Sequence, residues 1–417
     1  MFRLLLVLLL AAPFSASGYS VLTHMANVDS TWEACLLPTL QRRFPGGSPE
    51  DLAAAKSYAY GGAIIQDMGF YPFGSKLFTN LTHYVRSGDF VRALLDEAHD
   101  RNEYAFALGA LAHYSADSNG HPEGTNRAMA SVYPDLKAQF GPVITYEEAP
   151  AQHTQLEFAF DVVQVAAGRY RSDDYHRAIG FEVSKPVLER AFLKTYGLKL
   201  GQAIANVDLS IGSYRFVISQ LIPTATRAAW RAKGDEIRQL SPAVRRRDYV
   251  YHYHPRQYRR EFGGAYQKPG LGARLLSGVI RVLPKIGPLK PYAFTVPTPE
   301  AQALFRSSFR TVLRRYCELV KQQTAPGQLP RLPNTDFDTG EPTKAGHYAL
   351  ADETYGEWLR KLADDKFASV EPGVQQNILA FFAGQPKEPR DEDEKEARTR
   401  AQTQEALQQL RGWSGKE

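Results

Sequence analysis

Two apolar segments with helical periodicity each carry a histidine and a carboxylate four residues apart in this 417-residue chain. His113 and Asp117 lie in EYAFALGALAHYSADS, and His153 and Glu157 lie in HTQLEFAF. Residues four apart share one face of an α-helix. Burying either group alone on such a face is costly unless it is paired or binds a metal. The two segments therefore predict either buried hydrogen-bonded pairs or metal ligands on two helices.

Four further candidate residues lie in the same N-terminal half of the chain: His24, Asp67, His83 and His121. The whole chain has two cysteines, Cys35 and Cys317, and no CxxC pair. A bound metal would therefore be held by nitrogen and oxygen, which suits zinc. The two cysteines either form one disulfide or remain as two buried thiols.

The apolar pattern predicts an all-α fold. From about residue 31 to residue 240 the hydrophobic residues recur at helical spacing, and little of this half alternates with period two. The segment 103–118 is apolar on nearly every side, which predicts a central helix. In the C-terminal half a further helix is expected at about 299–323, and two shorter ones at 353–367 and 374–383.

The N-terminus is typical of a secretory signal. Arg3 precedes a short apolar run, and small residues follow at 15–18. The run is too short to span a bilayer. We expect residues 1–18 to be removed, with cleavage after Gly18 or alternatively after Ser17, and the mature protein to be periplasmic or secreted. An uncleaved anchor or a buried helix is the other interpretation.

The C-terminal half differs in composition. The formal net charge of the chain is +5, which suits an anionic substrate or membrane surface without selecting either. The basic and aromatic stretch 244–260 is compatible with nucleic-acid binding or with an ordinary interface. The apolar stretch 270–288 carries only positive charges. It predicts either peripheral membrane contact or a packed loop with a short helix. The charged tail 387–417 is expected to be a solvated helix or disordered.

In order and kind, the eight candidate residues resemble the metal-ligand set of the zinc-dependent phospholipase C family: His24, Asp67, His83, His113, Asp117, His121, His153 and Glu157. The S1/P1-type nucleases share that architecture. The resemblance covers about residues 19–240. It implies an all-α catalytic domain enclosing up to three zinc ions, followed by a mainly helical basic region (241–386) and the tail.

The resemblance also implies how the residues divide among the ions. Asp67, His83, His113 and Asp117 would surround one zinc, and His121, His153 and Glu157 a second. His24 and Asp117 would hold the third together with the amino group and carbonyl of Tyr19, the expected first residue after cleavage. Asp117 would then bridge two ions.

Two points remain open within this resemblance. The interval between Asp117 and His121 is shorter than is usual in the family, so Glu123 or Asn126 is an alternative to His121. The resemblance assigns Asp67 to orient or deprotonate the attacking water, and Glu157 is the alternative base.

The expected enzyme is a zinc-dependent phosphodiester hydrolase. Close metal ions neutralise a phosphate and activate water. A glutamate at position 157 is what the phospholipases have, whereas the nucleases tend to have Asp at the corresponding place. The Trp-Gly start that is typical of the nucleases is also absent. Phospholipase C-type cleavage of a glycerophospholipid is therefore favoured. The alternatives are an S1/P1-type single-strand nuclease and a non-catalytic, zinc-containing membrane-docking module.

Overall fold

The structure is a computed structural model that describes residues 20–71, 73–166, 182–216, 235, 295–323, 331–384 and 394–414. These residues are helical apart from loops and one isolated bridge between Thr335 and Pro342, and they contain no strand. The predicted all-α class is therefore confirmed. No helix in these ranges is long and apolar enough to cross a membrane. The predictions for the signal segment 1–18, for Tyr19 and for 270–288 lie outside the described residues.

The N-terminal part is a succession of helices and short helical turns. They are α2 (Val21–Thr31), the π-helical turn η1 (Trp32–Leu36), α3 (Leu37–Arg43), α4 (Pro49–Gly62), the 3-10 turn η2 (Ile65–Phe70), α5 (Lys76–Tyr84), α6 (Ser87–Asp96), α7 (Arg101–Gly120), the π-helical turn η3 (His121–Thr125), α8 (Asn126–Val132), α9 (Pro134–Phe140) and α10 (Pro150–Ala166). Then follow α12 (Lys185–Tyr196), α13 (Leu200–Ala203) and α14 (Val207–Phe216).

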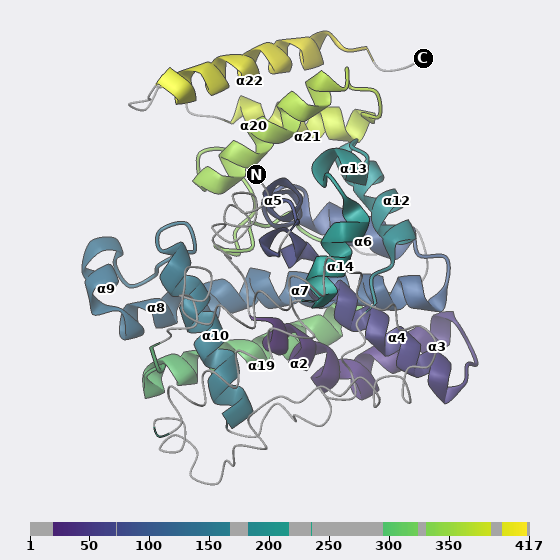
Figure 1. Cartoon of the computed structure of the whole chain (residues 1–417), viewed down its shortest axis with the longest axis vertical. Helices are drawn as coiled ribbons and strands as arrows, with labels where there is room; N and C mark the ends of the chain where they lie inside the picture. The colour runs from purple at the N-terminus through teal and green to yellow at the C-terminus, as the bar shows by residue number, and fades with distance from the viewer. Residues whose placement is uncertain are drawn as a thin grey trace, which may run out of the picture.

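Helix α7 crosses the middle of the molecule, as its apolar sequence predicts (Figure 1). Asp100 begins it by accepting hydrogen bonds from the backbone N–H groups of Asn102 and Glu103. Glycines let α4 and α7 approach closely. A Cβ on Gly62 would lie 1.9 Å from the Phe106 carbonyl oxygen, and one on Gly109 would lie 2.0 Å from that of Ala59. Any larger side chain at either position would force the two helices apart.

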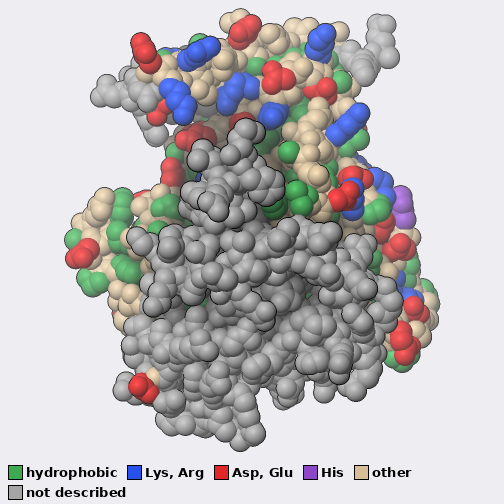
Figure 2. Space-filling view, in the orientation of Figure 1, with side chains coloured by type: hydrophobic (Ala, Val, Ile, Leu, Met, Phe, Trp, Pro, Cys, Tyr) green, Lys and Arg blue, Asp and Glu red, His purple; other side chains and the backbone are tan. Residues whose placement is uncertain are grey.

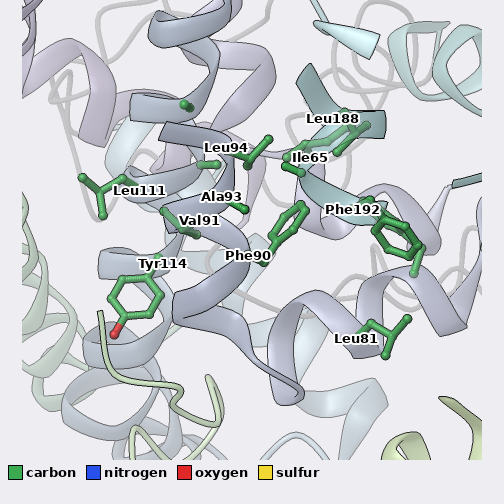
Figure 3. Close-up of a cluster of buried hydrophobic side chains, with 14 of the residues drawn as sticks. Ile65, Leu81, Phe90, Val91, Ala93, Leu94, Leu111, Tyr114, Leu188 and Phe192 are labelled. Atoms are coloured by element: carbon green, nitrogen blue, oxygen red, sulfur yellow. The ribbon is translucent and has the colours of Figure 1, made fainter. Parts of the chain in front are cut away.

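The core on the other side of α7 is built by α6 and α12. Figure 3 shows Phe90 and Leu94 of α6 among Leu111 of α7 and Leu188 and Phe192 of α12. All five side chains are fully buried. Burying such side chains contributes about 1.5–3 kcal/mol each, so this packing fixes the helices that carry the polar centre.

Helix α19 (Pro299–Lys321) brings the C-terminal half under the N-terminal helices (Figure 1). Thr298 caps its N-terminus by accepting from the Ala301 N–H at 3.1 Å. Tyr316 donates a hydrogen bond to the Leu108 carbonyl of α7 at 2.8 Å. Cys317 forms a disulfide with Cys35 of η1, so the first of the two alternatives for the cysteines holds.

Helices α20 (Ala349–Asp364), α21 (Pro372–Ala383) and α22 (Glu394–Gly412) form the layer at the top of Figure 1. Trp358 of α20 is buried, and its indole donates to the Tyr196 carbonyl at 2.8 Å. Within the charged tail, α22 is helical and buries Ala406 and Leu410. Its outer face mixes Lys and Arg with Asp and Glu (Figure 2).

The loop of residues 331–348, which leads into α20, returns to the N-terminal helices. Phe337 donates its N–H to the His83 carbonyl at 3.3 Å. The Ser87 hydroxyl donates to the Thr335 carbonyl at 2.6 Å, and the Tyr114 hydroxyl donates to the Pro333 carbonyl at 2.9 Å. The 331–348 loop is therefore part of the same packed unit as α5, α6 and α7.

Candidate metal centre

The eight histidines and carboxylates that the sequence analysis selected all belong to the described residues. Their side chains converge at one buried place. They come from six elements: His24 from α2, Asp67 from η2, His83 from α5, His113 and Asp117 from α7, His121 from η3, and His153 and Glu157 from α10. Each is at most 5% exposed. Because buried ionisable groups are costly unless they are paired or bind a metal, their convergence marks a site.

We define the first group as Asp67, His83, His113 and Asp117. One donor atom from each of these residues lies within 4.8 Å of the others. His113 Nε2 is 3.0 Å from Asp117 Oδ2, and His83 Nε2 is 3.3 Å from Asp67 Oδ1. Zinc ligands lie about 2.0–2.2 Å from the ion. The first group therefore has the residue types, the size and the convergence that a four-coordinate zinc requires.

The ring orientations in the first group support metal binding. His83 Nδ1 is 2.9 Å from the Thr79 carbonyl, and His113 Nδ1 is 2.9 Å from the Ala63 carbonyl. Because a carbonyl only accepts, each Nδ1 must carry the proton, and each Nε2 faces the group. Burial lowers the pKa of His83, but the Asp117 and Asp67 carboxylates outweigh it and raise that pKa to about 10. The carboxylates of Asp67 and Asp117 thus favour a positive charge beside His83 Nε2.

Asp117 lies between the candidate ligands from several elements. No hydrogen bond from a described residue reaches either of its oxygens, although both are buried. Its neighbours are imidazoles, with His24 Nε2 3.5 Å from Oδ1 and His113 Nε2 3.0 Å from Oδ2. Burial raises the pKa of Asp117, yet His113 and His24 lower it well below its usual value. The carboxylate is therefore ionised, and its two oxygens can bind two different cations.

We define the second group as His121, His153 and Glu157. Glu157 Oε1 is 2.9 Å from His153 Nδ1 and 3.5 Å from His121 Nε2. His153 Nε2 donates to Asn126 Oδ1 at 2.8 Å, so its Nδ1 carries the lone pair. Burial and the nearby His121 lower the pKa of His153 to about 3. A lone pair that faces a carboxylate oxygen at this distance requires a proton or a metal ion between them.

His24 lies beside both carboxylates of the first group. Its Nε2 is 3.5 Å from Asp117 Oδ1 and 4.0 Å from Asp67 Oδ2, and its ring stacks on His113 with centroids 4.3 Å apart. Burial, with a further contribution from His113, lowers the pKa of His24 well below its usual value. The ring is therefore neutral, which is the protonation state that a metal ligand needs.

The start of α2 is anchored to the helix that carries the second group. Asp161 of α10 accepts the Leu22 N–H at 3.0 Å and the Thr23 hydroxyl at 2.6 Å. Burial raises the pKa of Asp161 to about 6. This contact fixes the part of the chain that directly follows Tyr19.

The structure directs His121, rather than its two alternatives, toward the centre. Glu123 turns to Arg315, with its Oε1 3.4 Å from an Arg315 guanidinium nitrogen. The Oδ1 atom of Asn126 accepts a hydrogen bond from His153 Nε2. Helix α7 ends at Gly120, directly before His121, and the backbone continues as the π-helical turn η3 into α8. Such turns often occur at functional sites.

Sequence reasoning missed Asp338, in the 331–348 loop. Its Oδ1 lies 3.0 Å from His121 Nδ1. Burial raises the pKa of Asp338, but His121, Tyr348 and His153 together outweigh burial, and the pKa is lowered. Asp338 lies 181 residues after Glu157, the last of the eight residues, in a Pro-rich segment, and no periodicity or spacing connects it to them.

The comparisons with known proteins agree with this geometry. A family model described as zinc dependent phospholipase C matches residues 23–205. Comparison with curated proteins and with solved structures gave no significant match. The matched segment contains both groups and His24, and the buried Asp and His cluster fits the metal that this family uses. Over residues 23–205, the chain is similar to the zinc-dependent phospholipase C family.

Proposed function

We propose that this protein is a phosphodiester hydrolase that cleaves glycerophospholipids on the glycerol side of the phosphate. The observation that carries the proposal is the position of Asp117, with imidazoles of α2 and α7 on its two oxygens. The first group would hold one zinc and the second group another. His24 and Asp117, with the backbone of Tyr19, would hold a third.

The zinc ions, when bound, supply positive charge to the phosphate and lower the pKa of a water molecule to roughly 7. The protein contributes the placement of the groups around them. Asp67 is the best candidate to orient or deprotonate the water. It has the largest exposure of the eight residues, at 5%, and no hydrogen bond from a described residue reaches its Oδ1. Burial raises the pKa of Asp67, which makes it a stronger base than an ordinary aspartate.

Glu157 is the alternative base, but its surroundings favour a ligand role. Its Oε1 faces both imidazoles of the second group. Burial, reinforced by Asp117, raises the pKa of Glu157 well above its usual value. A zinc ion would take the place of that proton between Glu157 and the imidazoles.

Two aromatic rings lie along the centre. The ring centroid of Phe70 is 6.4 Å from that of His83, and the centroid of Tyr146 is 5.9 Å from that of His153. The two rings also face each other at 6.4 Å. They give the site an apolar side that suits a lipid, but the same rings can stack on a nucleobase.

A substrate panel tests the proposal. The purified, zinc-containing protein is incubated with phosphatidylcholine vesicles and, separately, with single-stranded DNA. We expect release of diacylglycerol and phosphocholine from the vesicles, and loss of that activity in Asp67→Asn. Zinc with DNA cleavage and no lipid turnover would make the protein an S1/P1-type nuclease. Zinc without turnover of either substrate would favour a docking module.

We also propose export with cleavage after Gly18, on the strength of the apolar run that precedes it. N-terminal sequencing of the mature protein should begin at Tyr19. A start at any other residue would exclude the Tyr19 amino group from the third site.

A further inference from the structure

Asp338 contacts the second group from outside the segment that the family model matches. The match ends at residue 205, and Asp338 lies in the 331–348 loop. Its side chain is fully buried. Its Oδ1 lies 3.0 Å from His121 Nδ1. Because a carboxylate accepts hydrogen bonds, Nδ1 carries the proton, and Nε2 of His121 faces Glu157 Oε1 at 3.5 Å.

Three of the other proposed ligand imidazoles are oriented differently. His83 and His113 donate to backbone carbonyls, and His153 donates to the Asn126 amide. Only His121 among these four rings is oriented by a carboxylate. A carboxylate partner fixes the ring and raises its basicity as a metal ligand.

The backbone of Asp338 reaches the other imidazole of the second group. Its carbonyl accepts a hydrogen bond from Asn126 Nδ2 at 2.6 Å. This bond fixes the amide so that Oδ1 of Asn126 faces His153, where it accepts from Nε2 at 2.8 Å. Asp338 therefore orients His121 directly and His153 through one intermediate residue.

Asp338 is itself held firmly. Its Oδ2 accepts hydrogen bonds from the hydroxyls of Tyr84, at 3.0 Å, and Tyr348. Its N–H donates to Asp336 Oδ1 at 2.8 Å. Gly340, with φ of 72°, lets the loop lie against the end of α7, because a Cβ there would be 2.7 Å from the Ser118 carbonyl. The side chain of Asp338 is thus held in place by α5 and by the loop itself.

We propose that Asp338 is a positioning residue that sets the zinc affinity of the second group, so that the complete metal site requires the 331–348 loop. This inference rests on the proposed zinc sites. The loop therefore completes a centre whose ligands all come from the N-terminal half.

The test is a zinc competition measurement on the full chain with Asp338→Ala. A fluorescent zinc chelator is titrated against the loaded protein at fixed pH. Loss of an outer-shell partner typically weakens a metal site by about 10- to 100-fold. We expect a loss of that size for one zinc ion and no change for the zinc of the first group. Asp336→Asn is the matched control, because it removes a neighbouring buried carboxylate but keeps an acceptor for the loop N–H groups. It should bind zinc like the wild type.

A double-mutant cycle separates positioning from general stability. If Asp338 acts through the second group, Asp338→Ala should cost no further zinc affinity in the His121→Ala background. An equal loss in both backgrounds, or a wild-type affinity in the single variant, would overturn the inference. If Asp338→Ala does not fold, Asp338→Asn decides the question by the same two comparisons, with a smaller expected loss. A wild-type protein that binds fewer than two zinc ions would instead refute the proposed function.

Discussion

The two ligand groups differ in what holds them. In the first group, the rings of His83 and His113 are oriented by carbonyls of Thr79 and Ala63, within the N-terminal helices. In the second group, the rings depend on Asn126 and on the remote Asp338. The side-chain hydrogen bonds that orient the rings of the first group therefore lie within the family-matched segment, whereas those of the second group include a residue of the C-terminal half. Metal affinity at the two groups should respond to different changes.

The largest effect is expected from Asp117→Asn, which changes the residue proposed to bridge the zinc of the first group and the third zinc. The amide cannot bind two cations as the carboxylate can. Zinc affinity should fall by more than the roughly 10- to 100-fold typical for loss of an outer-shell partner, and hydrolysis should fall with it. Metal analysis after gel filtration checks this, and full zinc occupancy in the variant would refute the bridging role.

The next comparison removes one imidazole from each group. His83→Gln should release a zinc from the first group, and His153→Gln should release one from the second. Each variant should keep the zinc of the other group, since the oriented rings there are unchanged. Competition titrations of the two variants give the stoichiometries. Loss of all zinc in both variants would mean that the groups do not bind independently.

The pH dependence of zinc binding should reflect the proton on His83. The raised pKa of about 10 means that this ring holds a proton at neutral pH until zinc displaces it. Affinity at the first group should therefore fall as pH decreases, by about tenfold per unit for each proton released. Titrations between pH 6 and 8 measure the slope. A flat profile would show that zinc does not compete with a proton on His83.

The smallest effect on either group is expected from breaking the Cys35–Cys317 disulfide. The bond joins residues 282 apart, so its loss should lower the free energy of unfolding by about 2–4 kcal/mol. Both groups should keep their zinc in Cys35→Ala/Cys317→Ala, because neither cysteine contacts them directly. Thermal unfolding and zinc content of this variant test the prediction. A selective loss of zinc would show that α19 supports one group.

The local pattern of the sequence predicted α7 and the two histidine–carboxylate pairs, because helical periodicity places such residues on one face. Asp67, His83 and His24 came from order and resemblance rather than from spacing. Helix α7 ends at Gly120, and the sequence pattern did not predict that the chain continues from there through a π-helical turn. Asp338 was beyond prediction, since only tertiary packing brings its loop to η3.

A crystal structure of the purified protein with anomalous scattering measured at the zinc edge tests the two-group arrangement most directly. We predict at least two anomalous peaks, one among Asp67, His83, His113 and Asp117, and another among His121, His153 and Glu157. Zinc content measured on the same sample should be at least two ions per chain. A single peak, or fewer than two zinc ions per chain, would contradict the two-group arrangement.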